Sequence, residues 1–307
     1  MHFLVVGAGA MGCLFGARLK KAGFQVDLYE KIAQRAKAIH ERGIKVQGVS
    51  GDYAVRVPAW SQKPPGVPDA VLLFVKSNNT EEAGKAVAPW VKETTLVLTL
   101  QNGLGNMEVL ERIFGKARVL GGVTSEGATV LDHGIIRHAG TGETSIGPSS
   151  GGAEKIVSAF HGAGFTSHVA EDIHSLIWGK LIVNVGINAL TALTGLKNGR
   201  LPRVKALCST MEMVVEEAVA VAKAKRVHLP YPDPLSRVID VCRATSENVA
   251  SMLQDVLNER VTEIDFINGA IVREGKALGI PTPANFVLTS LVEAVQETYG
   301  ERVSRRP

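Results

Sequence analysis

Residues 2–12 read HFLVVGAGAMG, and this stretch decides the fold that we predict for the 307-residue chain. An apolar run typical of a buried strand leads into the glycines, and a helical pattern continues through Ala22. In such a GxGxxG turn Gly7 permits the tight turn, Gly9 lets a pyrophosphate approach the backbone, and Gly12 lets the helix pack on the strand. The stretch predicts a dinucleotide-binding Rossmann unit with phosphates at the helix N-terminus.

A second predicted strand, residues 25–29, ends at Glu30, where such folds place the residue that reads the adenosine ribose. A carboxylate there accepts a hydrogen bond from the 2′-hydroxyl of NAD and repels the 2′-phosphate of NADP. Lys31 and Arg35 follow, and either cation could bind that phosphate or simply be a solvated surface charge. The local sequence leaves the choice of cofactor open.

Residues 173–196 read IHSLIWGKLIVNVGINALTALTGL and are apolar nearly all round, which predicts a buried helix that stops at Gly195. Lys180, Asn184 and Asn188 lie four residues apart, so they share one face of that helix. Buried polar groups are costly unless their hydrogen bonds are satisfied, and a small polar ligand could satisfy these. The alternatives are a strand at LIVNV, asparagines that cross-link the core, and a lysine whose amine reaches water. Three polar residues in register favour a functional stripe.

The composition is that of a globular protein with 45% hydrophobic residues, long enough for two domains with separate cores. We predict an α/β dinucleotide-binding domain over residues 1–168 and a mostly α-helical domain, carrying substrate and catalytic residues, over 169–307. A net charge of +4, spread along the chain, indicates no nucleic-acid partner but would not repel an anionic substrate.

The three cysteines, Cys13, Cys208 and Cys242, are far apart and lack metal-ligand spacing, so we expect no disulfide framework and no metal site. No export signal precedes the first strand, and we expect a cytoplasmic protein. The longest apolar run, 181–196, falls short of the ~20 residues that span a bilayer, so we expect no membrane partner.

Two further buried strands, 69–75 and 95–100, end near Lys76 and Asn102, at the edge of a parallel sheet where ligands bind. Either residue could equally be a helix cap or a surface group. Residues 45–57 read as an inserted hairpin, and 117–147 as strands broken by glycines, in which His138 is structural.

Apolar periodicity beyond residue 171 predicts helices over 211–225, 235–257 and 262–278. Asn248 and Ser251 would share a face of the second helix. Thr262 would cap the third, where the helix dipole favours Glu263 in the first turn whatever its function.

Four motifs together carry a family resemblance: GAGAMG at 7–12, QNG at 101–103, GKxxxN at 179–184, and NVASMLQD at 248–255 followed by TEIDFINGAI at 262–271. With them the chain resembles the ketopantoate reductase (2-dehydropantoate 2-reductase) family over nearly its whole length. The resemblance implies a Rossmann domain joined to a helical domain like the C-terminal domain of 6-phosphogluconate dehydrogenase. It also implies NADPH-dependent reduction of 2-dehydropantoate to pantoate, a step of pantothenate biosynthesis.

The resemblance also implies roles for single residues, with the lysine at position 180 as the general acid. We expect the substrate to contact Asn102, Asn184, Asn188, Asn198, Asn248, Ser251 and Glu263. We expect the cofactor to contact Gly7, Ala8, Gly9, Ala10, Met11, Gly12, Lys31, Lys76, Asn102, Gly127 and Glu263. Apolar surroundings should lower the pKa of Lys180 toward neutrality, whereas a nearby Glu263 carboxylate would favour the charged amine. We expect Ser251 and Glu263 to face Lys180 across the interdomain cleft.

One departure concerns the cofactor, because the family usually has an arginine where this chain has Glu30 and Lys31. We favour NADPH, since Glu30 at a solvent-exposed strand end could turn away while Lys31 and Arg35 close on the phosphate. NADH stays possible because of Glu30. The partner is a small 2-keto acid, with a homodimer possible. The alternatives are a β-hydroxyacid dehydrogenase, a reductase of another 2-keto acid, and a dinucleotide sensor without turnover.

Overall fold

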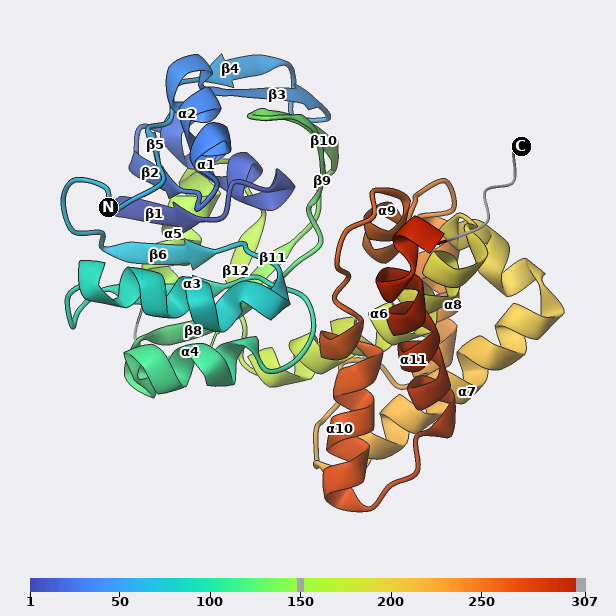
Figure 1. Ribbon diagram of the computed structural model, residues 1–307. Coiled ribbons are helices and arrows are strands. Elements are labelled where there is room, and N and C mark those ends of the chain that lie inside the picture. The colour runs from blue at the N-terminus through green and yellow to red at the C-terminus, as the bar shows by residue number, and fades with distance from the viewer. Residues whose placement is uncertain (148–151, 302–307) are drawn as a thin grey trace, which may run out of the picture. The chain divides into compact units, whose positions relative to one another are not determined.

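The computed structural model describes residues 1–147 and 152–301 of the chain. It divides into two compact units. The first, here the α/β unit, comprises residues 1–101 and 105–173, and the second, here the helical unit, comprises residues 102–104 and those from 174 onward. Figure 1 shows the strands gathered in the first unit and long helices forming the second. An α/β unit followed by a helical unit is the fold class that the sequence predicts.

The α/β unit is built on an eight-stranded sheet with the order β12-β11-β8-β7-β6-β1-β2-β5. All neighbouring strands are parallel except the antiparallel pair β8 and β11. The strands are β1 (His2–Val6), β2 (Gln25–Tyr29), β5 (Ala59–Trp60), β6 (Ala70–Leu73), β7 (Leu96–Thr99), β8 (Val119–Thr124), β11 (Thr144–Gly147) and β12 (Ser167–Val169). The buried strands predicted from apolar runs are confirmed as β1, β2, β6 and β7.

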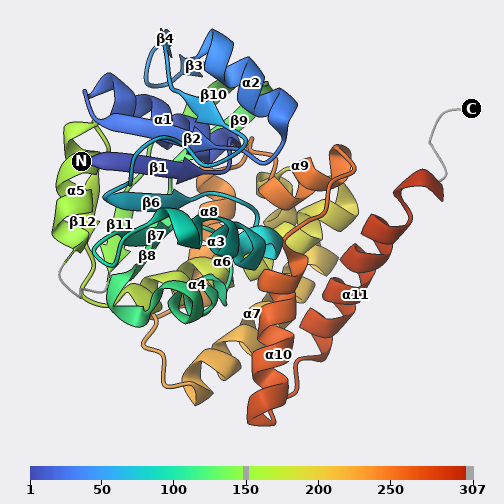
Figure 2. The same ribbon diagram turned by 60° about the vertical axis from the view of Figure 1, so that its left-hand side comes forward.

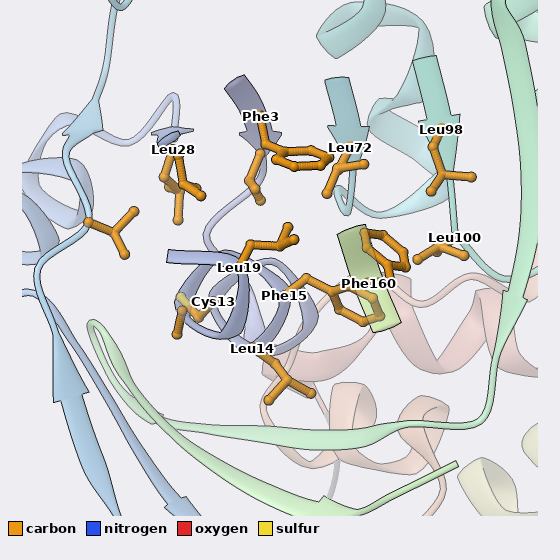
Figure 3. Packing of buried hydrophobic residues seen from close by; sticks show 14 of the residues in the cluster. Phe3, Cys13, Leu14, Phe15, Leu19, Leu28, Leu72, Leu98, Leu100 and Phe160 are labelled. Atoms are coloured by element: carbon orange, nitrogen blue, oxygen red, sulfur yellow. The ribbon is translucent and has the colours of Figure 1, made fainter. Parts of the chain in front are cut away.

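Helices cover both faces of this sheet, as the alternation of side chains along each strand requires. Phe3 and Val5 of β1 pack with α1 (Ala10–Lys21) and α5 (Ala153–Gly162), whereas Leu4 and Val6 pack with α3 (Thr80–Val87) and α4 (Asn106–Phe114). In Figure 3 Phe3, Leu72 and Leu98 point from neighbouring strands toward α1 and α5. The strand that leads into the glycine turn is thereby packed on both of its faces.

A second sheet, with the order β4-β3-β10-β9, packs on the face of α1 that points away from the main sheet (Figure 3). Its strands are β3 (Ile44–Gly48), β4 (Tyr53–Val55), β9 (Gly127–Asp132) and β10 (Ile135–Gly140). The predicted hairpin is confirmed as the antiparallel pair of β3 and β4. His138 of β10 is fully buried and lies 2.6 Å from the Glu126 carboxylate, which agrees with the structural role expected for it.

The helical unit contains six α-helices within the described residues, and α10 and α11 lie side by side (Figure 2). They are α6 (Ile173–Thr194), α7 (Lys205–Ala224), α8 (Pro234–Ala244), α9 (Ser251–Leu257), α10 (Asn268–Leu278) and α11 (Pro283–Glu297). The predicted buried helix is confirmed as α6, which stops where Gly195 adopts a φ of +70°. By length and composition alone α6 could cross a membrane, yet 67% of its most apolar window is buried inside the protein.

Two helix predictions in this unit are wrong. Residues 235–257 form two helices rather than one, because the chain leaves the helix after Ala244 and re-enters it at Ser251. The predicted helix over 262–278 begins at Asn268, after a short 3₁₀ turn named η5 (Ile264–Phe266). At the first break the carbonyls of Ser246 and Asn248 accept hydrogen bonds from residues 199 and 198, so a tertiary contact overrides local periodicity.

Candidate active site

The glycine turn has the geometry that a dinucleotide needs. Gly7 adopts a φ of +98°, and a Cβ on Gly12 would lie 1.9 Å from the Gly7 carbonyl oxygen, so neither position accepts a side chain without strain. A Cβ on Gly9 would meet no atom within 4 Å, which leaves its backbone open to a ligand. No side chain caps α1, and its first turn has no acidic residue, so its N–H groups suit a phosphate.

Glu30 is buried beside this turn, with only 6% of its surface exposed. Its carboxylate accepts hydrogen bonds from the backbone N–H of Ala8 (3.2 Å) and of Ile32 (3.0 Å) and from Nη1 of Arg35 (3.1 Å). The expectation that Glu30 lies exposed and can turn away is therefore wrong. Turning away would leave two backbone donors without a partner, which is unfavourable at a buried strand end.

The two cations near Glu30 are also held by carboxylates. Arg35 pairs with Glu30 itself, and Nζ of Lys31 lies 3.0 Å from the Glu82 carboxylate on α3, in an exposed pair. Each cation would have to leave its carboxylate before it could bind a 2′-phosphate.

Lys76 and Gly127 both belong to the α/β unit. Lys76 is partly buried and precedes the short 3₁₀ turn η1 (Ser77–Asn79), and Gly127 begins β9 opposite Gly140 of β10. Sequence reasoning missed Gln101, whose Nε2 donates to the Val75 carbonyl at 2.7 Å and thereby ties together the segments that follow β6 and β7.

Lys180, Asn184 and Asn188 lie along α6 in the helical unit. Although Lys180 is only partly buried, desolvation lowers the pKa of its amine from 10.5 to about 8, while the charge of Glu263 raises it. Asn188 is 5% exposed. Within residues 1–147 and 152–301, the structure gives no hydrogen-bond partner to the side-chain amide of Asn184 or Asn188. The stripe therefore combines a proton donor with amides that can bind a ligand.

Asn198 lies buried at the start of the 3₁₀ helix η4 (Asn198–Arg203), and its contacts explain the break after α8. Its backbone N–H donates to the Asn248 carbonyl at 3.2 Å, and its Nδ2 donates to Oγ1 of Thr245 at 2.9 Å. Its Oδ1 is buried without a partner in the described chain. Asn248 is exposed in the connection before α9, so the expectation that it shares a helix face with Ser251, the exposed first residue of α9, is wrong.

Glu263 lies just before η5, and its charge raises the pKa of Lys180 on α6. The expectation that Thr262 caps a helix is wrong, because the N-cap position of η5 is Glu263 and that of α10 is Ile267, although Oγ1 of Thr262 accepts from the Ile264 N–H at 3.2 Å. Lys180, Ser251 and Glu263 all belong to the helical unit. The expectation that Ser251 and Glu263 face Lys180 across the interdomain cleft stays a prediction.

The QNG motif is split between the two units, and Asn102 belongs to the helical one. The Leu104 N–H donates to the Phe266 carbonyl at 3.0 Å. Gly103 has a φ of +83°, and a Cβ there would lie 2.3 Å from the same oxygen. Asn102 thus lies on a segment that is hydrogen-bonded to the one that carries Glu263. No spacing in the sequence signals this pairing, because residues 103 and 266 are distant along the chain.

Comparison with known proteins covers both units. The family model described as "Ketopantoate reductase PanE/ApbA" matches residues 3–151, and its C-terminal counterpart matches residues 172–296. The 2-dehydropantoate 2-reductase of Pyrococcus abyssi is 37% identical over 306 residues, which cover 98% of this chain and 100% of the relative.

Solved structures agree with these matches. A PanE/ApbA family ketopantoate reductase from Ralstonia eutropha superposes with a TM-score of 0.90 at 35% identity, covering 98% of this chain and 100% of that one. A D-mandelate dehydrogenase with bound NADH and anilino(oxo)acetate superposes with a TM-score of 0.91 at 28% identity and the same coverage.

Proposed function

The chain belongs to the ketopantoate reductase family, and on that premise we propose that it reduces a 2-keto acid to the 2-hydroxy acid with a nicotinamide dinucleotide. The first candidate substrate is 2-dehydropantoate, which would place the product, pantoate, in pantothenate biosynthesis. The observation that carries the proposal is the α6 stripe, in which the amine of Lys180 lies under the influence of Glu263 beside amides that have no protein partner in the described chain.

Lys180 acts as the general acid in this proposal. When bound, the dinucleotide supplies a hydride to the carbonyl carbon. As the carbon–oxygen π bond breaks, its electron pair takes a proton from Nζ of Lys180, so the ketone becomes an alcohol and the lysine is left neutral. A pKa of about 8 suits this step, because the amine is mostly protonated at pH 7 yet releases its proton readily.

The neighbouring polar groups orient the substrate. The amides of Asn184 and Asn188 can donate to a carboxylate or accept from a hydroxyl without adding charge. A contact between Asn198 and the substrate stays a prediction, because its Oδ1 is buried without a partner in the described chain. Contacts from Asn248, Ser251 and Glu263 to the substrate stay predictions. So do contacts from Asn102 and from the cofactor-side residues Lys31, Lys76 and Gly127.

For the cofactor we propose a preference for NADH over NADPH, which reverses the expectation from sequence. That expectation required Glu30 to turn away, and its three hydrogen bonds oppose such a movement. A fixed carboxylate can accept from a ribose 2′-hydroxyl and would repel a 2′-phosphate. The engagement of Lys31 by Glu82 and of Arg35 by Glu30 supports the same choice.

A second candidate substrate is an aromatic 2-keto acid, because the D-mandelate dehydrogenase superposes as well as the ketopantoate reductase does. The test is the rate of NADH and NADPH oxidation with 2-dehydropantoate, phenylglyoxylate and pyruvate. The first proposal requires the highest kcat/KM with 2-dehydropantoate. A higher value with phenylglyoxylate would favour the second candidate, and tight dinucleotide binding without any turnover would indicate a sensor.

The setting that fits this activity is the cytoplasm, and the free thiols of Cys13, Cys208 and Cys242 suit a reducing compartment. A homodimer stays a prediction, which the mass measured by light scattering in solution would test.

A further inference from the structure

A chain of buried and partly buried polar side chains links four helices of the helical unit. Glu217 on α7 accepts hydrogen bonds from the backbone N–H groups of Ala284 (2.8 Å) and Asn285 (2.9 Å) at the start of α11. It also accepts from Nδ2 of Asn285 at 2.7 Å. Oδ1 of Asn285 accepts from Nδ2 of Asn268 at 3.0 Å, and the same Nδ2 lies 3.3 Å from the Val185 carbonyl of α6.

Asn268 is unusual as a core residue. It is fully buried, and its Oδ1 has no hydrogen-bond partner in the described chain. An orphaned buried oxygen is unfavourable, and an apolar side chain at this position would remove it only by leaving Oδ1 of Asn285 without its donor. What only the amide provides is the pair of donated hydrogen bonds, one of which reaches α6.

The position of these contacts connects them with the candidate active site. Val185 directly follows Asn184 on α6 and lies in the turn after Lys180. Asn268 begins α10, and the five residues before it form η5 and the segment that starts at Glu263. The hydrogen bond from Asn268 therefore joins the start of α10, five residues after Glu263, to α6, the helix that carries Lys180.

We propose that Asn268 is a positioning residue, which fixes α6 against the segment that carries Glu263 and so sets the separation of the Lys180 amine from the Glu263 carboxylate. In the function proposed above, Lys180 is the general acid and Glu263 is a predicted substrate contact. The catalytic consequence of this inference rests on that function. The structural consequence is independent of any substrate.

The separation of Lys180 from Glu263 can be measured through the pKa of Lys180, which depends on the groups that face this part of α6. The charge of Glu263 raises the pKa of Lys180, whereas burial lowers it. Tyr231, whose hydroxyl donates to the Gly179 carbonyl, has a pKa raised to about 12 and stays neutral over the working range. If the tie to α6 is lost, Glu263 and Lys180 can separate, and the pKa of Lys180 should fall.

The test compares Asn268→Ala and the milder Asn268→Ser with Val292→Ala, a control that removes fully buried apolar atoms from α11 of the same unit. The pKa of Lys180 is read by NMR of the full chain carrying labelled lysine, with the Lys180 signal assigned from its loss in Lys180→Ala. We expect about 8 in the wild type and in Val292→Ala, and a lower value in Asn268→Ala.

In the same proteins kcat should fall about tenfold or more in Asn268→Ala, less in Asn268→Ser, and little in Val292→Ala at an equal loss of Tm. An unchanged Lys180 pKa in both Asn268 variants, with losses that follow Tm as in the control, would overturn the positioning role. Because the NMR measurement needs no substrate, it tests this role even if no 2-keto acid is turned over.

Discussion

Glu30 accepts a hydrogen bond from the Ala8 backbone N–H at 3.2 Å, so the carboxylate at the end of β2 is fastened to the turn that would hold the cofactor. This contact links cofactor choice to the geometry of the glycine turn. The sequence shows Glu30 only as a charge at a strand end, whereas in the structure its carboxylate is a hydrogen-bond acceptor in a fixed position.

Replacing Glu30 by alanine should move the enzyme toward NADPH. The substitution removes the repelling carboxylate and frees Arg35 for the phosphate. A charge-assisted hydrogen bond contributes about 1.5–3 kcal/mol, so the NADPH/NADH ratio of kcat/KM should rise roughly 10–100-fold. The matched control is Glu81→Gln, an exposed carboxylate of α3 paired with Lys85. A wild type that prefers NADPH, with a ratio unchanged in Glu30→Ala, would contradict the assignment.

Gly103→Ala should disturb the segment that carries Asn102. The new Cβ would require a strained φ of +83° and would lie 2.3 Å from the Phe266 oxygen. We expect a loss of about 1–3 kcal/mol in the free energy of unfolding, together with a lower kcat. Gly105→Ala separates the two causes, because Gly105 has a φ of +98° but open space around its Cβ. Equal effects in both variants would show that the contact with Phe266 is unimportant.

The pH dependence of reduction should report Lys180. The donor is the protonated amine, so kcat should be highest below its pKa and fall as pH rises through about 8. The charge of Glu263 raises that pKa, and in Glu263→Gln the basic limb should therefore move to lower pH. Activity that increases steadily from pH 7 to pH 9 would be incompatible with an acid at this position.

Glu217→Gln should destabilise the helical unit. Its carboxylate accepts from two backbone N–H groups at the start of α11, where the helix dipole favours a negative charge. We expect a loss of about 1–2 kcal/mol, measured by urea unfolding. The neighbouring Glu216 is exposed on the same helix, and Glu216→Gln should change stability by less than about 0.5 kcal/mol. Similar losses in the two variants would refute a capping role for Glu217.

Features that depend on local pattern could be predicted from the sequence. The strand, glycine turn and helix around residues 2–21 follow from apolar runs and from backbone freedom at Gly7, and α6 follows from its length and its stop at Gly195. The lowered pKa of Lys180 and the opposing effect of Glu263 were also predictable, because an amine among apolar neighbours loses hydration wherever the helix packs.

Features that depend on contacts between distant residues could not be predicted. The break after α8 is stabilised by hydrogen bonds to Asn198 and Gly199, and the QNG segment joins the helical unit through the Phe266 carbonyl. The carboxylate of Glu30 is fixed by the donors that surround it, including Arg35 one helical turn later. A periodic pattern along one segment contains no information about such partners.

The most direct test of the central claim is the kcat of Lys180→Ala for reduction of 2-dehydropantoate, measured together with the Kd for the reduced cofactor. If Lys180 donates the proton, kcat should fall by ~10²–10⁴-fold while the Kd stays close to that of the wild type. A kcat near that of the wild type would contradict the account, because the proton would then have to come from another group.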